Sequence, residues 1–256
     1  MTLYRMEAWL QRGYGVRFDW GPEGARRLAP GSAYAVVVDV LSFTTSVSVL
    51  VDAGTRVHPR AWHDVGEQTA LPVAVGRRAV TAEQPWSLSP AALRDAKHIP
   101  DLVLPSPNGS AIAAAIKDHC GLVAGSLRNA EAVGRWLSDN DVGTPDRPLT
   151  VIAAGERWPD GSLRPALEDL LGAGAIIAAC GAADRLSPEA RTAAQAYQGT
   201  ADLRAAIMDS ASGRELTAIG FRDDVTIALE INASGRVPVL RDGEAFTAAD
   251  PGEGVD

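Results

Sequence analysis

Polar residues that could do chemistry in this sequence come directly after short apolar runs. Four such polar segments begin at Asp39, Ser106, Gly125 and Gly155. The apolar runs before them are short and partly β-branched, which is typical of buried strands in a parallel sheet. Ligands of open parallel sheets bind beyond the carboxyl ends of the strands. We therefore expect these four segments to meet at one binding site.

The first three segments each precede a predicted helix. A helix N-terminus presents unpaired N–H groups and roughly half a positive charge, so several of them together would bind an anion such as phosphate. Each of these polar residues alone is also typical of an ordinary helix cap, and only their repetition favours a binding site. The predicted substrate-binding residues are Ser42, Thr44, Thr45, Ser106, Asn108, Gly109, Gly125, Ser126, Arg128, Asn129, Gly155 and Glu156.

Acidic residues near these segments could bind a metal ion or catalyse a reaction. Asp39 ends an apolar strand, where an unpaired carboxylate is costly, so we interpret it as a metal ligand or a nucleophile, with a cap or an ion pair as the alternative. Glu168 and Asp169 are adjacent on a helix of otherwise small and apolar residues, and at most one of them points straight into a shared site. With Asp223 they give a set of hard oxygen ligands, which favours Mg²⁺. The predicted catalytic residues are Asp39, Glu168 and Asp169, and the predicted metal ligands are the same three with Asp223.

Composition narrows the classes of protein. The 256 residues include 24 Lys and Arg against 32 Asp and Glu, a net charge of −8, which argues against a nucleic-acid partner. No stretch of about 18 apolar residues is present to span a membrane. The sequence begins without the apolar core of a signal peptide, and its two cysteines form no CxxC motif. We expect a cytoplasmic protein.

Strand-like and helix-like segments alternate along the chain, which predicts a three-layer α/β/α fold with a largely parallel sheet. Strands are predicted at residues 14–18, 35–38, 73–75, 102–104, 122–124 and 149–154, and helices at 24–28, 43–53, 110–119, 130–138, 163–179, from 187 onward and at 201–211.

The sequence shows no long linker that would divide it into separate domains. We expect a single α/β domain over residues 1–241, or two tightly packed halves. Residues 77–100, with three prolines, are predicted to be a long irregular segment. Residues 242–256 are rich in Gly, Asp and Glu and are predicted to be a flexible acidic tail.

The sequence from about residue 34 to 240 resembles the 2-phosphosulfolactate phosphatase family. Its motifs occur in order: Val38-Asp39-Val40-Leu41-x-x-Thr44-Thr45, Ser106-Pro107-Asn108-Gly109, Gly125-Ser126-x-x-Asn129-Ala130, Ala154-Gly155-Glu156, Leu167-Glu168-Asp169-x-x-x-Ala173-Gly174-Ala175, and Gly220-Phe221-x-Asp223-Asp224. This resemblance implies an α/β/α fold and Mg²⁺-dependent hydrolysis of a small anionic phosphate ester, in a family linked to coenzyme M synthesis. A homodimer is compatible with the sequence.

Two departures from the family pattern concern anion recognition. The family usually has an arginine where this chain has Ser42, and a Gly-Glu-Arg run where this chain has Gly76-Arg77-Arg78. A lost guanidinium removes bidentate anion binding, which Arg77 or Arg128 could restore. A phosphatase for another metabolite and a non-catalytic anion-binding domain are the alternatives. The acidic residues at positions 39, 168, 169 and 223 argue against the anion-binding domain, since added negative charge does not help anion binding.

Two mechanisms follow from the resemblance. Either Asp39 binds the metal and water attacks, or Asp39 attacks and forms an aspartyl-phosphate. The haloacid-dehalogenase superfamily also uses an aspartate at a strand end, but it expects a second acid at the position that Leu41 occupies here.

Overall fold

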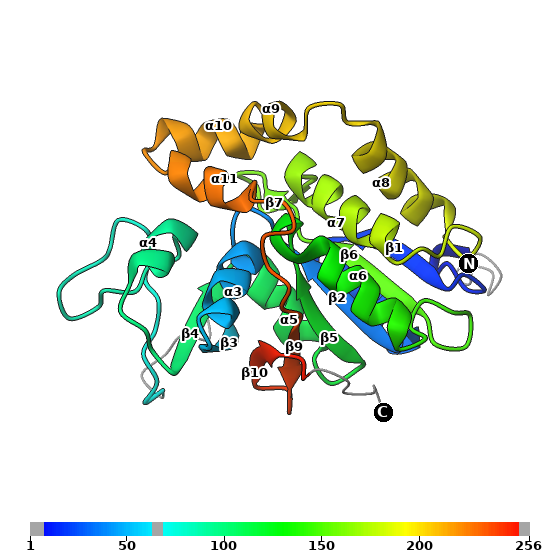
Figure 1. The fold of residues 1–256 in the computed structure, drawn as a ribbon, viewed down its shortest axis with the longest axis horizontal. Helices are drawn as coiled ribbons and strands as arrows, with labels where there is room; N and C mark the ends of the chain where they lie inside the picture. The colour runs from blue at the N-terminus through cyan, green and yellow to red at the C-terminus, as the bar shows by residue number, and fades with distance from the viewer. Residues whose placement is uncertain (1–7, 63–68, 251–256) are drawn as a thin grey trace.

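An eight-stranded, mostly parallel sheet lies between two layers of helices in the computed structural model, which describes residues 8–62 and 69–250 (Figure 1). The strand order is β1-β6-β2-β5-β9-β10-β3-β4. The pairs β1–β6, β6–β2, β2–β5 and β3–β4 are parallel, and the β9–β10 hairpin joins the two parallel parts through antiparallel pairs. The strands are β1 Val16–Trp20, β2 Tyr34–Val38, β3 Arg56–Ala61, β4 Asp101–Ser106, β5 Gly121–Gly125, β6 Leu149–Ala153, β9 Pro238–Arg241 and β10 Ala245–Ala248.

Helices cover both faces of the sheet, which confirms the predicted α/β/α architecture. Alternate residues of β2 enter different cores: Val36 and Val38 pack in the core under α6, α7 and α8, and Ala35 and Val37 pack in the core under α2, α3 and α5. The helices are α2 Gly21–Leu28, α3 Phe43–Asp52, α4 Pro90–Asp95, α5 Gly109–Ile116, α6 Ala130–Asp139, α7 Leu167–Ala179, α8 Pro188–Gly199, α9 Leu203–Met208, α10 Ala211–Ala218 and α11 Arg222–Ala228.

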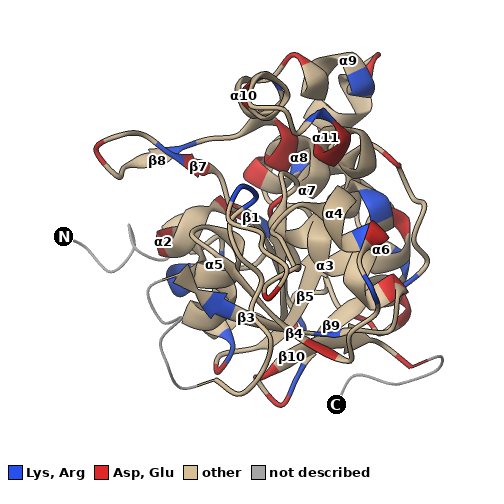
Figure 2. Cartoon of the chain, turned by 90° about the vertical axis from the view of Figure 1, so that its left-hand side faces the viewer, with Lys and Arg blue, Asp and Glu red and all other residues tan. Residues whose placement is uncertain are grey.

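Several predicted elements differ in the structure. Residues 73–75 form only isolated bridges, Val73 to Val103 and Val75 to Ser87, instead of a strand. The predicted helix at 163–179 begins at Leu167, because Leu163–Arg164 is strand β8, which pairs with β7 (Glu156–Arg157). This β7–β8 hairpin projects from the body of the protein (Figure 2).

The C-terminal half of the chain also departs from the prediction at two places. The predicted helix at 201–211 is shorter in the structure, where α9 ends at Met208. A further helix that was not predicted, α10, begins at Ala211, and the Ser210 side chain caps it by accepting from the Gly213 N–H. The predicted flexible tail is wrong for residues 245–248, which form β10 and pair with β9 and β3. Residues 251–256 of that tail lie outside the described residues. The irregular segment 77–100 contains the short helix α4.

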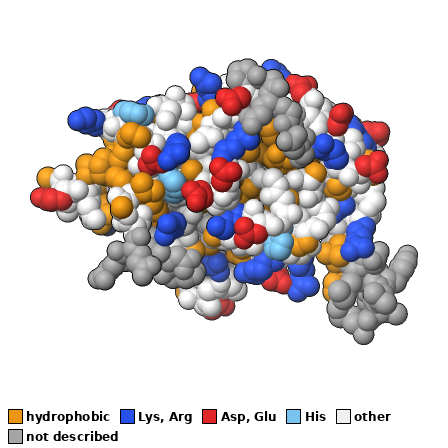
Figure 3. Space-filling view, turned by 90° about the horizontal axis from the view of Figure 1, so that it is seen from below, with side chains coloured by type: hydrophobic (Ala, Val, Ile, Leu, Met, Phe, Trp, Pro, Cys, Tyr) orange, Lys and Arg blue, Asp and Glu red, His pale blue; other side chains and the backbone are white. Residues whose placement is uncertain are grey.

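The surface carries mixed charge. On the face seen in Figure 3, basic and acidic side chains are interspersed. None of the helices in residues 8–62 and 69–250 has the length and apolar character needed to cross a bilayer.

Glycines inside α7 allow close packing of neighbouring elements. A Cβ at Gly172 would lie 2.7 Å from Val40 Cγ2, and a Cβ at Gly174 would collide with the Ala193 carbonyl of α8. Glycine in a helix costs roughly 1 kcal/mol relative to alanine. The close contact between α7 and α8 therefore requires a residue without a side chain at position 174.

We predict that Gly174→Ala lowers the free energy of unfolding by about 1–3 kcal/mol, since the overpacking exceeds the gain in helix propensity. Thermal and denaturant unfolding would measure this change. Gly199→Ala at the end of α8 is the matched control, because nothing described lies within 4 Å of a Cβ built there. Equal stability of the two variants would contradict the packing argument.

Candidate active site

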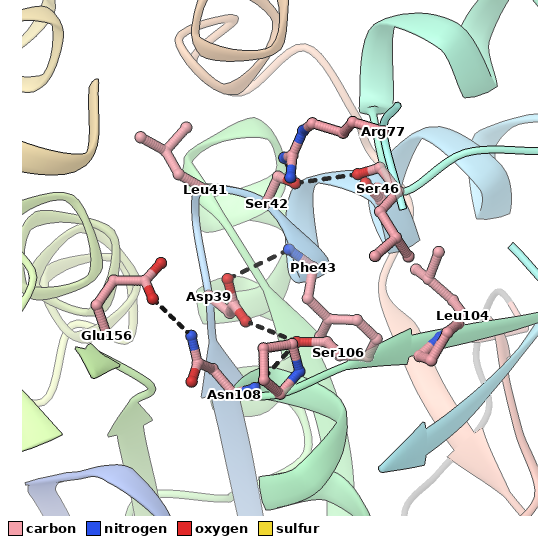
Figure 4. Close-up of a pocket in the computed structure, with 13 residues that line it drawn as sticks. Asp39, Leu41, Ser42, Phe43, Ser46, Arg77, Leu104, Ser106, Asn108 and Glu156 are labelled. Carbon is pink, nitrogen blue, oxygen red and sulfur yellow. Dashed lines mark hydrogen bonds between the residues drawn. The ribbon is translucent and has the colours of Figure 1, made fainter. Parts of the chain in front are cut away.

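A small pocket lies where β2 and β4 end. Its volume is about 120 Å³, well below the roughly 300–1,000 Å³ of pockets that hold drug-sized ligands. Asp39, Ser42, Ser106, Asn108 and Glu156, all predicted site residues, line it (Figure 4). The pocket therefore suits a small polar molecule.

Two helix N-termini hold the carboxylate of Asp39 in this pocket. Asp39 Oδ1 accepts from the Phe43 N–H of α3 at 3.2 Å, and Oδ2 accepts from the Gly109 N–H of α5 at 2.8 Å. Burial raises the pKa of Asp39, and these N–H groups act in the opposite direction. The helix N-termini that were predicted to bind a ligand thus bind the chain's own carboxylate. Gly109 is required there, because a Cβ would lie 2.7 Å from Asp39 Oδ2.

Asp169 joins the ends of two strands and does not line the pocket. Its Oδ1 accepts from the Val40 N–H at 2.7 Å and its Oδ2 accepts from the Gly155 N–H at 2.8 Å. Burial, followed by the nearby charges of Asp39 and Glu168, raises the pKa of Asp169 well above its usual value. The structure therefore assigns Asp169 a role in positioning the loops after β2 and β6.

Glu168 is buried beside this group and contacts a different helix. Its Oε2 accepts from the Ser210 hydroxyl at 3.1 Å, at the start of α10. Its charge contributes to raising the pKa of Asp39, after burial as the main cause. The adjacent acids 168 and 169 thus point to different partners, in keeping with the angle between neighbouring helical residues.

Glu156 is the second carboxylate that lines the pocket. Asn108 Nδ2 donates to its Oε2 at 2.9 Å. Burial, with a further contribution from Asp39, raises the pKa of Glu156 to about 7. The group can therefore hold or release a proton near neutral pH.

Arg77 enters the pocket from the irregular segment before α4. Its Nη2 donates to the Ser42 hydroxyl at 2.6 Å, and its Nε donates to Asp224 Oδ2 at 2.7 Å. The sequence identified Arg77 only as one of two replacements for a missing arginine. The other, Arg128, contacts Asp52, Glu230 and Ser48 and does not line this pocket.

Other predicted substrate-binding residues have structural contacts. The Thr44 and Thr45 hydroxyls donate to the backbone carbonyls of Asp39 and Val40, at 2.8 Å each. These two bonds fix the turn between β2 and α3.

The segment after β5 does not reach the pocket. Asn129 Oδ1 accepts from the Ser126 N–H at 2.8 Å, which closes a capping box. A Cβ at Gly125 would lie 2.7 Å from Val36 Cγ1, so the glycine allows close packing at this position. The predicted substrate-binding residues Gly125, Ser126, Arg128 and Asn129 therefore do not line this pocket.

The predicted metal ligands fit Mg²⁺ only in part. Asp223 is exposed on α11, and Asp169 does not line the pocket. Within residues 8–62 and 69–250, no three His, Cys, Asp or Glu side chains are placed to bind a metal together. Mg²⁺, however, usually takes one or two carboxylates together with water and substrate phosphate. Asp39 lines the pocket and suits that smaller role, whereas Glu168, the other predicted ligand whose charge acts on Asp39, does not line it.

Comparison with known proteins supports the class that the fold and the pocket indicate, a phosphoric monoester hydrolase. A family model described as 2-phosphosulpholactate phosphatase matches residues 23–243. The 2-phosphosulfolactate phosphatase of Methanothermobacter thermautotrophicus is 31% identical over 222 residues, which cover 83% of this chain and 89% of that protein. The chain belongs to the 2-phosphosulpholactate phosphatase family.

We predict that Glu156→Gln gains stability relative to the wild type as pH rises. In the unfolded chain Glu156 ionises near its ordinary value of 4.5, and in the folded protein near 7. Between pH 4.5 and about pH 7, Glu156 binds a proton more strongly in the folded state than in the unfolded state. Its contribution therefore lowers the wild-type free energy of unfolding as pH rises, by about 1–3 kcal/mol in total. Thermal unfolding at about pH 5 and about pH 8 would measure the difference.

The exposed Glu215→Gln is the control for this experiment. A difference between Glu156→Gln and wild type that does not change with pH would contradict the raised pKa.

Proposed function

We propose that this protein hydrolyses the phosphate ester of a small acid, with 2-phosphosulfolactate as the first substrate to test. The observation that carries the proposal is the pair of carboxylates in the pocket, Asp39 held by two helix N-termini and Glu156 held by Asn108. Membership in the family and the small pocket support it. The products would be sulfolactate and inorganic phosphate, which agrees with a role in coenzyme M synthesis.

We propose Mg²⁺ as the cofactor, held by Asp39 together with the substrate phosphate. Two carboxylates line the pocket, whereas its one described cationic side chain, Arg77, is already paired with Asp224. A phosphate dianion would meet net negative charge there unless a cation accompanied it. When bound, Mg²⁺ would neutralise phosphate charge and polarise the phosphoryl group.

The chain's own residues supply orientation and proton transfer. Asp39 is fixed by the Phe43 and Gly109 N–H groups and needs no rearrangement to act. The oxygen of water forms a bond to phosphorus while the ester bond breaks; one proton of that water stays on the product phosphate, and the other passes to solvent, from which Glu156 regains the proton it donates. Glu156, protonated in part near neutral pH, donates a proton to the leaving ester oxygen, and Asn108 orients it.

The rival functions are less well supported. A non-catalytic anion-binding domain has no use for two carboxylates in its pocket. A phosphatase for a different phosphorylated acid uses the same groups, and activity measurements on a panel of phosphorylated acids would distinguish it.

We predict that Asp39→Asn lowers kcat by about 100-fold or more, because one of the groups that act on the phosphate loses its charge while the Phe43 N–H contact to the Oδ1 position is retained. Steady-state hydrolysis of 2-phosphosulfolactate would measure this change. Asp223→Asn is the matched control, since that acid is exposed on α11. Wild-type turnover by Asp39→Asn would remove Asp39 from the mechanism.

The same assay can identify the attacking group. Labelled phosphate trapped on Asp39 during turnover would identify it as the nucleophile. Turnover without label on the protein would support direct attack by water.

We predict that removal of divalent cations with EDTA abolishes hydrolysis and that Mg²⁺ restores it. Titration of the metal-free protein with Mg²⁺, with and without inorganic phosphate, would show tighter binding when phosphate is present, because the protein alone offers few ligands. Full turnover in excess EDTA would rule out the metal.

A further inference from the structure

One end of the pocket differs in chemistry from the end that holds Asp39 and Glu156. Figure 4 shows Arg77, Ser42 and Ser46 grouped there. Ser46 and Ser42 lie on or just before α3, and Arg77 comes from the segment before α4. This end, the tail subsite, therefore combines a guanidinium with two hydroxyl groups.

The guanidinium of Arg77 is fixed in place. Its Nε donates to Asp224, which is 1% exposed, and its Nη2 donates to Ser42. The same guanidinium lies over the Phe221 ring, 5.7 Å from the ring centroid. These contacts leave further N–H donors on the guanidinium for a ligand.

Asp224 contacts the segment that carries Arg77 at three residues. Besides the Arg77 guanidinium, it accepts from the Ser89 hydroxyl and, at 3.3 Å, from the Ala91 N–H at the start of α4. One buried carboxylate of α11 therefore holds both the cation and the helix that follows it.

Ser46 provides an independent sign that a ligand belongs here. Its side chain is buried, with the residue only 1% exposed, and it lines the pocket. Its hydroxyl has no hydrogen-bond partner among the described residues. Buried polar groups are nearly always paired, so an unpaired hydroxyl at a pocket wall indicates a missing partner.

The charge balance shows which kind of group fits the tail subsite. Asp224 already offsets the charge of Arg77, so the subsite suits a singly charged group more than a phosphate dianion. Sulfonates and carboxylates are such groups, and both accept hydrogen bonds from guanidinium and hydroxyl donors.

We propose that Arg77, Ser42 and Ser46 bind an acidic group of the substrate, a sulfonate or a carboxylate, while its phosphate lies at the Asp39 end. Asp224 is the positioning residue for this subsite. The proposal rests on the proposed phosphatase activity. It makes Arg77 the residue that distinguishes phosphate esters with a sulfonate or carboxylate from those without one.

Two substrates that differ in their acidic groups test it. The kcat/KM values of Arg77→Met would be compared for 2-phosphosulfolactate and for isopropyl phosphate, a phosphate ester without a sulfonate or a carboxylate. We expect the fold-loss in kcat/KM for 2-phosphosulfolactate to exceed that for isopropyl phosphate by about tenfold or more. Arg77→Lys should recover part of the kcat/KM for 2-phosphosulfolactate. Arg78→Met is the matched control, because this neighbouring arginine is exposed and donates to the Ile219 carbonyl.

A binding measurement tests the subsite without turnover. Sulfoacetate carries the acidic groups without a phosphate, and calorimetry would measure its Kd; ethanesulfonate and propionate would show which acid is preferred. We expect Arg77→Met and Ser46→Ala to weaken sulfoacetate binding, while Ser46→Ala keeps or raises the Tm because an unpaired buried hydroxyl is removed.

The positioning role of Asp224 has its own readout. Asp224→Asn should raise KM for 2-phosphosulfolactate with a smaller change in kcat, whereas Asp223→Asn on the same helix should change neither. Equal losses in kcat for both substrates, with an unchanged KM, would show that Asp224 supports only the fold.

The outcomes separate the two proposals. A wild-type protein that hydrolyses neither ester contradicts the proposed function, and Arg77-dependent sulfoacetate binding would still support the subsite. Hydrolysis with equal losses for both esters in Arg77→Met, together with unchanged sulfoacetate binding, would overturn the subsite alone.

Discussion

The site depends on the placement of one ionisable carboxylate where a buried strand meets two helices. Asp39 is buried at the end of β2, and its two oxygens accept the first N–H groups of α3 and α5. Burial disfavours its charged form, and the aligned helix ends favour it. Because α3 and α5 pack in the same core, the carboxylate also fixes the relation between them.

A second buried carboxylate gives the site its rigidity. Asp169 binds the amides that follow β2 and β6, and so connects the loop that begins at Asp39 to the loop that carries Glu156. These two acids illustrate how identical side chains at one sheet edge take different roles. Asp39 faces the pocket, and Asp169 satisfies backbone donors that would otherwise be unpaired.

Sequence patterns predicted the layers and the sheet edge, because apolar runs and helix caps are local signals. Asp39, Ser42, Ser106, Asn108 and Glu156 were identified in this way and line the pocket. The segment after β5 gave the same local signal, yet Ser126 and Asn129 bind each other. A cap residue and a ligand-binding residue have the same sequence signature, and only the three-dimensional structure distinguishes them.

Long-range contacts explain what sequence patterns missed. The excursion between β3 and β4 has no periodicity, so nothing local could show that Arg77 reaches Asp224, far along the chain. Likewise β9 and β10 are short, and β10 pairs with β3 at a single register position.

The residues that line the pocket come from two kinds of structural element, the ends of regular strands and helices and the irregular segment before α4. The groups at the Asp39 end come from strand and helix ends, where a substitution disturbs the core. Arg77 comes from a segment outside the regular strands, and Asp224 holds both its guanidinium and the start of α4. Evolution could therefore exchange the acid that such a protein recognises by altering this segment, while the hydrolytic groups stay as they are.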